Sequence, residues 1–560
     1  MMSEIKKFIS QALTILNFTS VDFTVSPPAD LNHGDYSTNV ALILAKINHR
    51  PAKEIAEKIV KQIFNVNWLS RVEVADPGFI NFYLSTDFLL ENLRAILKQE
   101  SAYGRGRARQ GQKIIIEYTD PNPFKEFHIG HLMSNTIGET IARLIEFQGA
   151  TIKRACYQGD VGLHVAKAIW GSQKLKIKSV GEIKNWGQAY TFGAEKYEAD
   201  TIAKQEINGL NRKIYDRSDS AVNQLYDQGR RVSLDYFEMI YQRLGTKFDY
   251  YFFESETSGL GKKLVEENIG QIFERNDGAV IFRAEKYDPQ LHTRVFLTKE
   301  NLPTYEAKEL GLAKIKFDRF AYDQSIVLTG NEVNDYFAVV LKALTLVFPE
   351  LAAKTVHLGH GMLRLPSGKM SSRTGTVIAA ENLLAEIKTT MSEKIAARNF
   401  KPEEGDKITE AVAVAAIKYS ILKQALGRDV IFDFAKSLSF EGDAGPYLQY
   451  TLIRARAVLN QAVVENISAD FKQIPDEITE LEHQLFHFPE VAARAARLYA
   501  PNLLVTYLTE LAATFNHYYA TKQIIGPDTG APYRLALTQA AATVLANGLE
   551  LLAIPVPERM

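Results

Sequence analysis

The spacing of apolar and polar positions predicts a small α/β unit in the first part of the chain. Apolar residues recur at helical intervals in Ser3–Leu16, Ser37–Lys46 and Ala52–Phe64, which predicts three helices. Between turn-forming residues, Val72–Leu84 alternates apolar and polar positions, which predicts two short strands. The basic, glycine-containing stretch at 101–111 is typical of a solvated linker, so this unit ends there.

After the linker, strand-like segments alternate with helical ones. Lys113–Tyr118 is a β-branched run, which predicts a strand. The helix expected after it has an apolar stripe made of Ile137, Ile141, Leu144 and Ile145. Later strands are expected at Ala279–Phe282, Ser325–Leu328 and Val356–Leu363. This alternation predicts a doubly wound parallel sheet of the Rossmann type, whose ligands bind beyond the carboxyl ends of its strands.

These patterns divide the chain into three predicted domains. An N-terminal α/β domain covers 1–105, the parallel-sheet domain covers 106–400, and an all-helical bundle with Ala, Leu and Tyr at helical spacing covers 401–560. The stretch from about 172 to 245 is rich in charge and helical in pattern, so we expect it to be an insertion on the parallel sheet.

Composition narrows the classes of function. The 560 residues are 46% hydrophobic and 23% charged, which is typical of a globular protein. Because 65 Lys and Arg face 66 Asp and Glu, a nucleic-acid partner would have to be held by local patches. The single cysteine, Cys156, excludes intrachain disulfides and a cysteine-cluster zinc site. With a charged amino-terminal segment and no apolar run of membrane-spanning length, we expect a soluble, cytoplasmic protein.

The first candidate site lies in EYTDPNPFKEFHIGHL, Glu117–Leu132. A predicted strand ends there, and His128-Ile129-Gly130-His131 opens a helix. Both imidazoles can face a ligand at the helix terminus, where free N–H groups and the helix dipole favour phosphates. Paired histidines also occur as metal ligands or core residues, but a metal pair more often has i, i+4 spacing and needs a third ligand. The position between strand and helix favours the phosphate interpretation.

The second candidate site is GMLRLPSGKMSSRTGTV, Gly361–Val377. Small residues surround Lys369, and Arg373 follows. This pattern is typical of a mobile loop whose cations close over a polyphosphate. Taken in isolation, a solvated Gly/Ser loop is the simpler interpretation.

Together these two features resemble the HIGH and KMSKS signatures of class I aminoacyl-tRNA synthetases, and the arginyl-tRNA synthetases are most similar. The resemblance runs nearly end to end, through GDYSTNVALILAK, DPGFINFYL, PNPFKEFHIGHL, YQGDVGLHVAK, LPTYEAKELGLA, FEGDAGPYLQYTLIRARAVL and ANGLELLAIPVPERM. It implies an ATP-dependent ligase that attaches L-arginine to its tRNA through an arginyl-adenylate, with Mg²⁺ brought by ATP and release of AMP and pyrophosphate. It also implies a monomer, and no zinc or other protein-held metal.

The resemblance assigns residues to the nucleotide. The implied catalytic residues are Lys125, His128, His131, Lys369 and Arg373, and ATP contacts are implied for the two histidines with Gly130, Gly361, Met362, Lys369, Met370 and Ser371. One departure is informative, since the family's second loop lysine is replaced here by Ser372. Lys125, three residues before His128, can deliver the missing cation to the phosphates. The alternative is a surface lysine beside Glu126.

For arginine, the resemblance assigns Glu117, Asn122 and His131 to the α-amino and carboxyl end, and Tyr305 and Glu309 to the side-chain end. Tyr305 and Glu309 lie four apart on an expected helix, so a carboxylate can meet a guanidinium beside an aromatic ring. The family usually has Asp at the position of Glu309. Outside this motif, such a pair would be interpreted as a surface feature.

For tRNA, Phe79 and Asn81 occupy positions where the family reads a D-loop base, although they could equally be alternating strand residues with Phe79 in a core. Contacts from the helical bundle, which resembles the family's anticodon-binding domain, are implied for Tyr450, Arg454, Asn516, Tyr519 and Met560. Each of these aromatic residues, taken singly, is more often a core residue.

Three rival interpretations are weaker. A cysteinyl-type synthetase needs a cysteine-held zinc, which a single cysteine cannot build. A small nucleotidyltransferase would leave both flanking domains without a role. A catalytically inactive tRNA-binding relative is disfavoured because His128, Gly130, His131, Lys125 and Lys369 are all present.

Overall fold

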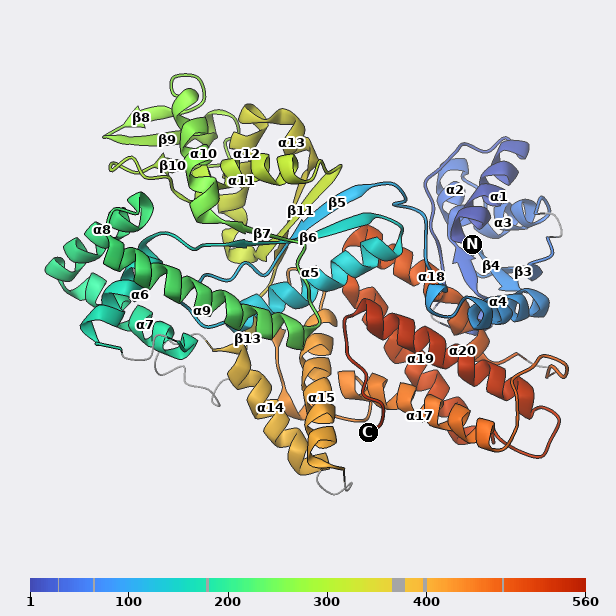
Figure 1. The fold of residues 1–560 in the computed structure, drawn as a ribbon. Coiled ribbons are helices and arrows are strands. Elements are labelled where there is room, and N and C mark those ends of the chain that lie inside the picture. The colour runs from blue at the N-terminus through green and yellow to red at the C-terminus, as the bar shows by residue number, and fades with distance from the viewer. Residues whose placement is uncertain (29, 64–65, 178–180, 365–377, 396–399, 476–477) are drawn as a thin grey trace. The chain divides into compact units, whose positions relative to one another are not determined.

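The computed structural model describes residues 1–560 except 29, 64–65, 178–180, 365–377, 396–399 and 476–477 (Figure 1). Two compact units are present in it. The first consists of Met1–Gly104, Arg454–Glu490 and Glu510–Asn547, and the second of Arg105–Ile453, Val491–Thr509 and Gly548–Met560. The helical bundle expected at 401–560 contributes residues to both units, and the three-domain division stays a prediction.

An antiparallel sheet with strand order β1-β2-β4-β3 organises the first unit. Its strands are β1 (Val25–Ser26), β2 (Tyr36–Thr38), β3 (Leu69–Ala75) and β4 (Phe79–Leu84). The helices are α1 (Met2–Ile15), α2 (Val40–Asn48), α3 (Ala52–Val60) and α4 (Thr86–Gln99), with short 3₁₀ turns at Leu31–His33 and Glu100–Ala102. The strand pair within Val72–Leu84 is confirmed. The helix expected over Ser37–Lys46 is wrong at its start, because β2 covers Ser37 and Thr38 and pairs with both β1 and β4.

A five-stranded parallel sheet is the framework of the second unit. Its strand order is β12-β11-β5-β6-β7, and every neighbouring pair is parallel. The strands are β5 (Lys113–Glu117), β6 (Thr151–Gln158), β7 (Tyr250–Phe253), β11 (Gln324–Gly330) and β12 (Thr355–His360). The order reverses between β5 and β11, so the point where ligands bind in doubly wound folds lies beyond Glu117 and Gly330.

Helices lie on both sides of this sheet (Figure 1). On one side is α5 (Ile129–Phe147), and on the other are α10 (Glu254–Glu267), α11 (Tyr305–Arg319), α12 (Asn334–Val347) and α13 (Pro349–Lys354). Ile115 of β5 and Phe252 of β7 are buried with Leu312 of α11. Burial of these apolar side chains stabilises the sheet and fixes the strand ends that precede the candidate site.

One predicted strand belongs to a different sheet. β9 (Ala279–Arg283) lies between β8 (Glu274–Asn276) and β10 (Thr293–Leu297) in a separate antiparallel sheet, so its assignment to the parallel sheet is wrong. The turn before it, Asp277-Gly278, has positive φ at both residues, which is the geometry of a tight hairpin. The strand expected over Val356–Leu363 is also divided, because β12 ends at His360 and β13 (Leu363–Arg364) pairs with β14 (Val430–Ile431).

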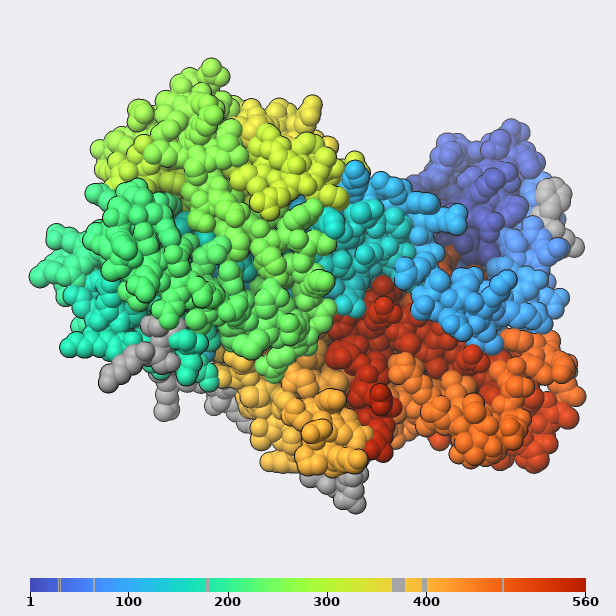
Figure 2. Space-filling model, viewed as in Figure 1, coloured from blue at the N-terminus to red at the C-terminus, as the bar shows by residue number. Residues whose placement is uncertain are grey.

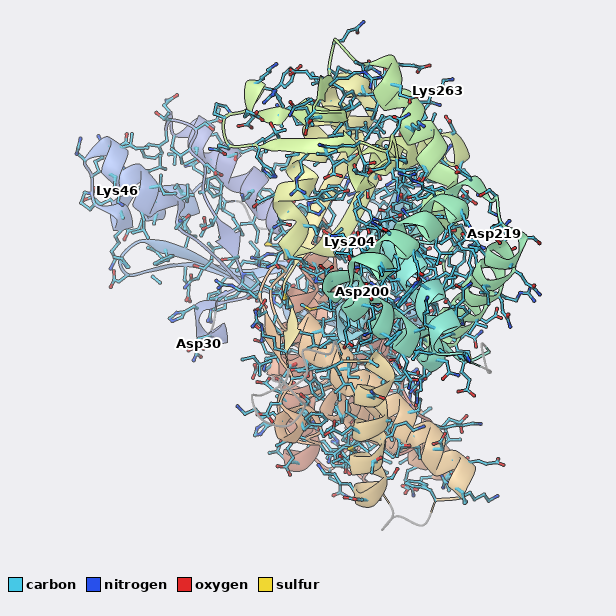
Figure 3. The ribbon with its side chains drawn as sticks, turned by 90° about the vertical axis from the view of Figure 1, so that its left-hand side faces the viewer. Asp30, Lys46, Asp200, Lys204, Asp219 and Lys263 are labelled. Carbon is cyan, nitrogen blue, oxygen red and sulfur yellow. The ribbon has the colours of Figure 1, made fainter. Side chains whose placement is uncertain are left out.

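The stretch expected to form a helical insertion is helical in the structure. It comprises α7 (Ile183–Ala199), α8 (Thr201–Asp216) and α9 (Ser220–Leu244), packed with α6 (Leu163–Lys174). Asp200 and Asp219 accept hydrogen bonds from the first free N–H groups of α8 and α9, as N-cap residues do. Figure 3 shows Asp200 and Lys204 at the start of α8, and Figure 2 shows the insertion, in teal to green, at the surface.

Apart from β14, the regular structure of the remaining described chain is helical, as expected. Its helices are α14 (Ala380–Ile395), α15 (Pro402–Leu422), α16 (Phe434–Ser437), α17 (Gly445–Val464), α18 (Glu480–Leu498), α19 (Pro501–Thr521) and α20 (Ala531–Leu551). Among the described residues, no helix has the length and apolar character needed to cross a membrane.

Candidate active site

The amino end of α5 is closed by its own histidines. His128 is the N-cap, with extended backbone, and its Nδ1 accepts hydrogen bonds from the backbone N–H of Gly130 at 3.1 Å and of His131 at 3.4 Å. In return, the His131 Nδ1 accepts from the His128 N–H at 3.3 Å. This reciprocal capping box satisfies helix-end donors and fixes both rings.

The two imidazole rings stack, with centroids 3.5 Å apart and planes inclined by 24°. Burial, together with the nearby Lys125 ammonium, lowers the pKa of His128 to about 4. Burial also places the pKa of His131 well below its usual value, with His128 and Lys125 adding to the effect. Both rings are therefore neutral at pH 7. Because each Nδ1 accepts a backbone N–H, the ring proton is on Nε2, and each ring can donate from that atom.

The loop between β5 and α5 holds an uncommon backbone conformation. Thr119, Asp120 and Phe124 all have positive φ, at 82°, 46° and 67°, a region that non-glycine residues rarely adopt. The Thr119 N–H donates to Ser134 Oγ of α5 at 2.9 Å, and the Phe124 N–H donates to Ser233 Oγ of α9 at 2.8 Å. Surrounding elements thus maintain a strained loop, as is common at functional sites.

Lys125 lies in this strained loop beside the histidine pair. Its side chain is half-buried, and its ammonium lies 4.0 Å from the ring centroid of Tyr190, on α7. Burial, with the Lys125 charge adding to the effect, lowers the pKa of His164 to about 3. His164 belongs to the YQGDVGLHVAK segment but was not assigned a role from the sequence. The structure therefore gathers a lysine and three neutral histidines in one place.

The chain that leaves the second motif is attached to the first. The Ile129 N–H donates to the Ile378 carbonyl at 3.0 Å, and the Ala380 N–H donates to the Phe127 carbonyl at 2.8 Å. An antiparallel bridge pairs His128 with Ala379. Four predicted site residues of this motif lie outside the described residues: Lys369, Met370, Ser371 and Arg373. The chain leaving that stretch is nevertheless anchored at the histidine pair.

Gly361 and Met362 follow the carboxyl end of β12. A Cβ on Gly361 would lie 2.2 Å from the Arg428 carbonyl oxygen, so only glycine permits this close approach. The Met362 N–H donates to Asp429 Oδ1 at 2.9 Å, and the Met362 side chain is 40% exposed. These contacts place an accessible thioether at the same edge of the sheet as the histidine pair.

Carboxylates gather at the other end of the site. Glu117, at the end of β5, is buried and forms an ion pair of 2.9 Å with Lys316 of α11. Glu309, also on α11, has a pKa raised to about 8 by burial and then by the nearby Glu117. The same two causes place the pKa of Asp120 well above its usual value. One lysine, Lys316, accompanies these three carboxyl groups, so carboxyl groups outnumber cations in this cluster.

The remaining predicted arginine-site residues border this carboxyl cluster. A Cβ on Gly159 would lie 2.3 Å from Asn122 Oδ1 and 3.2 Å from Glu254 Oε1, so Asn122 approaches the strand end only because residue 159 is glycine. Tyr305 begins α11 and is 55% exposed. The Lys308 ammonium lies 5.2 Å from the Tyr305 ring centroid and 2.6 Å from Glu254.

The residues predicted for tRNA fall into separate groups. Phe79 is 38% exposed on β4, so it is not a core residue, whereas Asn81 is 3% exposed and its Oδ1 has no hydrogen-bond partner among the described residues. In the first unit, the Arg454 guanidinium donates to Asn516 Oδ1 at 2.5 Å and lies 4.9 Å from the Tyr519 ring centroid.

Tyr450 and Met560 belong to the second unit. The Tyr450 ring packs edge-on against Phe440, with centroids 6.4 Å apart, and Met560 is half-buried.

Three features together are those of a class I aminoacyl-tRNA synthetase: a doubly wound parallel sheet, a histidine pair that caps the helix after β5, and the chain that follows the second sequence motif held beside that pair. Comparison with known families agrees. Residues 92–434 match the model of the class I tRNA synthetase (R) catalytic domain, 3–84 match the arginyl-tRNA synthetase N-terminal domain, and 448–560 match the DALR anticodon-binding domain. The chain belongs to the arginyl-tRNA synthetases, enzymes that attach arginine to tRNA.

Individual relatives cover nearly all or all of the chain. It is 30% identical to the arginine–tRNA ligase of Clostridium acetobutylicum over 92% of each chain, and 28% identical to that of Halothermothrix orenii over 99% of this chain and 98% of the other. The arginyl-tRNA synthetase of Thermus thermophilus has a TM-score of 0.81 at 25% identity and covers 100% of both chains. The resemblance noted in the sequence is confirmed.

Proposed function

We propose that this chain catalyses the ATP-dependent attachment of L-arginine to its tRNA in two steps. In the first, a carboxylate oxygen of arginine attacks the α-phosphorus of ATP, which enters as its magnesium complex. The new C–O–P linkage forms as the bond to the β-phosphate oxygen breaks, giving arginyl-adenylate and pyrophosphate. No proton needs to move in this step, so catalysis consists of positioning the reactants and stabilising charge.

The nucleotide end supplies hydrogen-bond donors without changing protonation state. Nε2–H of His128 and of His131 donates to phosphate oxygens as negative charge shifts during the attack. The Lys125 ammonium offsets charge on the leaving pyrophosphate, with Lys369 and Arg373 assisting. The capping box supports this assignment, because rings fixed before the substrate arrives require no reorganisation in the transition state.

The amino-acid end supplies acceptors. Glu309 receives the guanidinium beside Tyr305, while Glu117, Asn122 and His131 hold the α-amino and carboxylate groups. Citrulline would leave a buried carboxyl group unpaired, and lysine cannot reproduce the planar fork of donors, so both are rejected. The excess of carboxyl groups over cations at this end supports the assignment.

In the second step, the 2′-hydroxyl of the terminal tRNA ribose attacks the adenylate carbonyl, and AMP leaves. We place Phe79 and Asn81 at a D-loop base and the helical bundle at the anticodon, and we propose that adenylate formation requires bound tRNA. We further propose that the protein is a monomer and that it works in the cytoplasm. The buried free thiol of Cys156 supports the cytoplasmic location, because free thiols persist in a reducing compartment.

The observation that carries this proposal is the stacked pair of neutral histidines, which the Lys125 charge reaches and whose flanking backbone is hydrogen-bonded to the chain after the basic motif. The test is aminoacylation of total tRNA with each of the twenty amino acids and ATP. Of the twenty amino acids, only arginine should give charged tRNA. Charging with another amino acid, or none with arginine, would contradict the proposal.

A further inference from the structure

One helix of the insertion extends along the loop that carries Lys125. Phe124 is fully buried and its ring packs edge-on against Trp186 of α7, with centroids 5.0 Å apart. Gly229 of α9 makes room for both rings, because a Cβ there would lie 2.2 Å from Phe124 and 2.8 Å from Trp186. Tyr190 is four residues after Trp186, so both aromatic rings lie on one face of α7.

The Tyr190 ring is placed to fix the next residue of the loop. The Lys125 ammonium lies 4.0 Å from its centroid, well inside the range of a cation–π contact. Among the described residues, no carboxylate lies within ion-pairing distance of that ammonium, although Glu126 is its neighbour in sequence. The ring therefore holds the cation without neutralising it, which leaves its charge available to an anion.

We propose that Tyr190 is a positioning residue for adenylate formation, holding the Lys125 ammonium at the phosphates. This inference rests on the proposed role of Lys125. Lysine has a flexible side chain with many rotamers, and a displaced cation stabilises a transition state poorly. The aromatic face restricts those rotamers before ATP binds, so the insertion contributes to the chemical step.

A matched set of substitutions separates this role from a structural one. Tyr190→Phe keeps the ring, whereas Tyr190→Leu removes it but keeps an apolar side chain. Tyr197→Leu is the control, because the Tyr197 ring makes a similar contact, 4.1 Å from the Lys167 ammonium, on the same helix. The measurement is ATP–pyrophosphate exchange in the presence of tRNA and arginine, with kcat and KM determined separately.

Tyr190→Leu should lower kcat by roughly tenfold, while the KM values for arginine and ATP stay within about twofold. Tyr190→Phe and Tyr197→Leu should both retain the parent kcat. In a Lys125→Ala background, Tyr190→Leu should cause no further loss, because the group it positions is gone. Trifluorophenylalanine at position 190 keeps the shape of the ring but weakens the cation–π contact. The kcat of this variant should lie below that of Tyr190→Phe, which tests the inference even if Tyr190→Leu folds poorly.

Four results would overturn the inference: an unchanged kcat in Tyr190→Leu, an equal loss in Tyr190→Phe, a further loss in the Lys125→Ala background, or a rise confined to the KM for arginine. The last would place Tyr190 at the amino-acid end instead. Full activity of Lys125→Ala alone would remove the proposed role of Lys125 itself, whereas a slow Lys125→Ala with a fully active Tyr190→Leu removes only the role of Tyr190.

Discussion

Burial shifts side-chain pKa values in opposite directions at the two ends of this site, the proposed nucleotide end and the proposed amino-acid end. At the nucleotide end, burial and a nearby lysine lower the pKa of His128 to about 4. At the amino-acid end, burial and a nearby carboxylate raise the pKa of Glu309 to about 8. The cause is the same, since a low-dielectric environment disfavours whichever form is charged.

The two ends consequently respond differently to their substrates. His128 and His131 stay neutral between pH 6 and 8 and offer fixed donors, so triphosphate binding at that end needs no change of protonation. Glu309 is largely protonated in the empty site at neutral pH and must lose its proton before it can pair with a guanidinium. On the proposed assignment of these residues, arginine binding is coupled to proton release, whereas ATP binding at the histidine pair is not.

The largest expected effect concerns the nucleotide end. Lys125→Ala should slow arginyl-adenylate formation by roughly 10²- to 10³-fold, the usual result of losing a preorganised transition-state contact. Pyrophosphate exchange in the presence of tRNA measures this. Lys196→Ala, which removes an ammonium 5.8 Å from the Phe192 ring on the same insertion helix as Tyr190, is the control and should be fully active. Equal rates for the two variants would show that Lys125 is a surface lysine.

The next effect concerns the amino-acid end. Glu309→Gln keeps the shape but removes the charge, and should raise the KM for arginine by roughly 100-fold with a smaller change in kcat. Asp318→Asn disrupts the exposed Lys314–Asp318 pair on the same helix and should leave both parameters unchanged. If Glu309→Gln binds arginine normally, the guanidinium is held elsewhere.

A pH series compares the two ends directly. Below its pKa of about 8, Glu309 is protonated and cannot form an ion pair, so arginine affinity should rise with pH. The KM for arginine should fall by up to about tenfold per pH unit from pH 6 and level off above pH 8. The KM for ATP should stay constant, because the histidine pair does not titrate in this window. A KM for arginine that does not change with pH, or that changes equally in Glu309→Gln, would contradict the assignment of this titration to Glu309.

The smallest expected effect is outside the catalytic unit. Phe79→Ala should weaken tRNA binding by roughly fivefold to tenfold, the lower part of the range for base stacking. Filter binding at a fixed salt concentration measures this. Tyr287→Ala removes a comparably exposed aromatic side chain from the connection between β9 and β10 and should bind tRNA normally. Equal affinity of the two variants would indicate that Phe79 does not stack on a base.

Local patterns predicted much of the fold. The apolar run of β5 and the stripe of α5 were readable because their periodicity is uninterrupted. β6 was missed because Lys153 and Arg154 interrupt its pattern, and their partners, Asp249 and Glu139, are known only from the folded chain. β9 was assigned to the wrong sheet because a five-residue apolar strand carries no information about its neighbours.

The candidate site divides in the same way. The histidine pair could be predicted since the capping box and the stacking arise within four consecutive residues. The ion pair of Lys316 with Glu117 joins residues 199 positions apart, and no motif marks Lys316. Tyr190 likewise lies in an insertion where the sequence shows only helical periodicity. Charges and rings that act on a motif from distant elements need the tertiary structure to be found.

The most direct test of the central claim is a crystal structure with a non-hydrolysable arginyl-adenylate analogue bound. The α-phosphate surrogate should lie within hydrogen-bond distance of the Nε2 atoms of His128 and His131, with the guanidinium against Glu309. An analogue whose phosphate surrogate contacts neither imidazole, or whose guanidinium lies away from α11, would contradict the account.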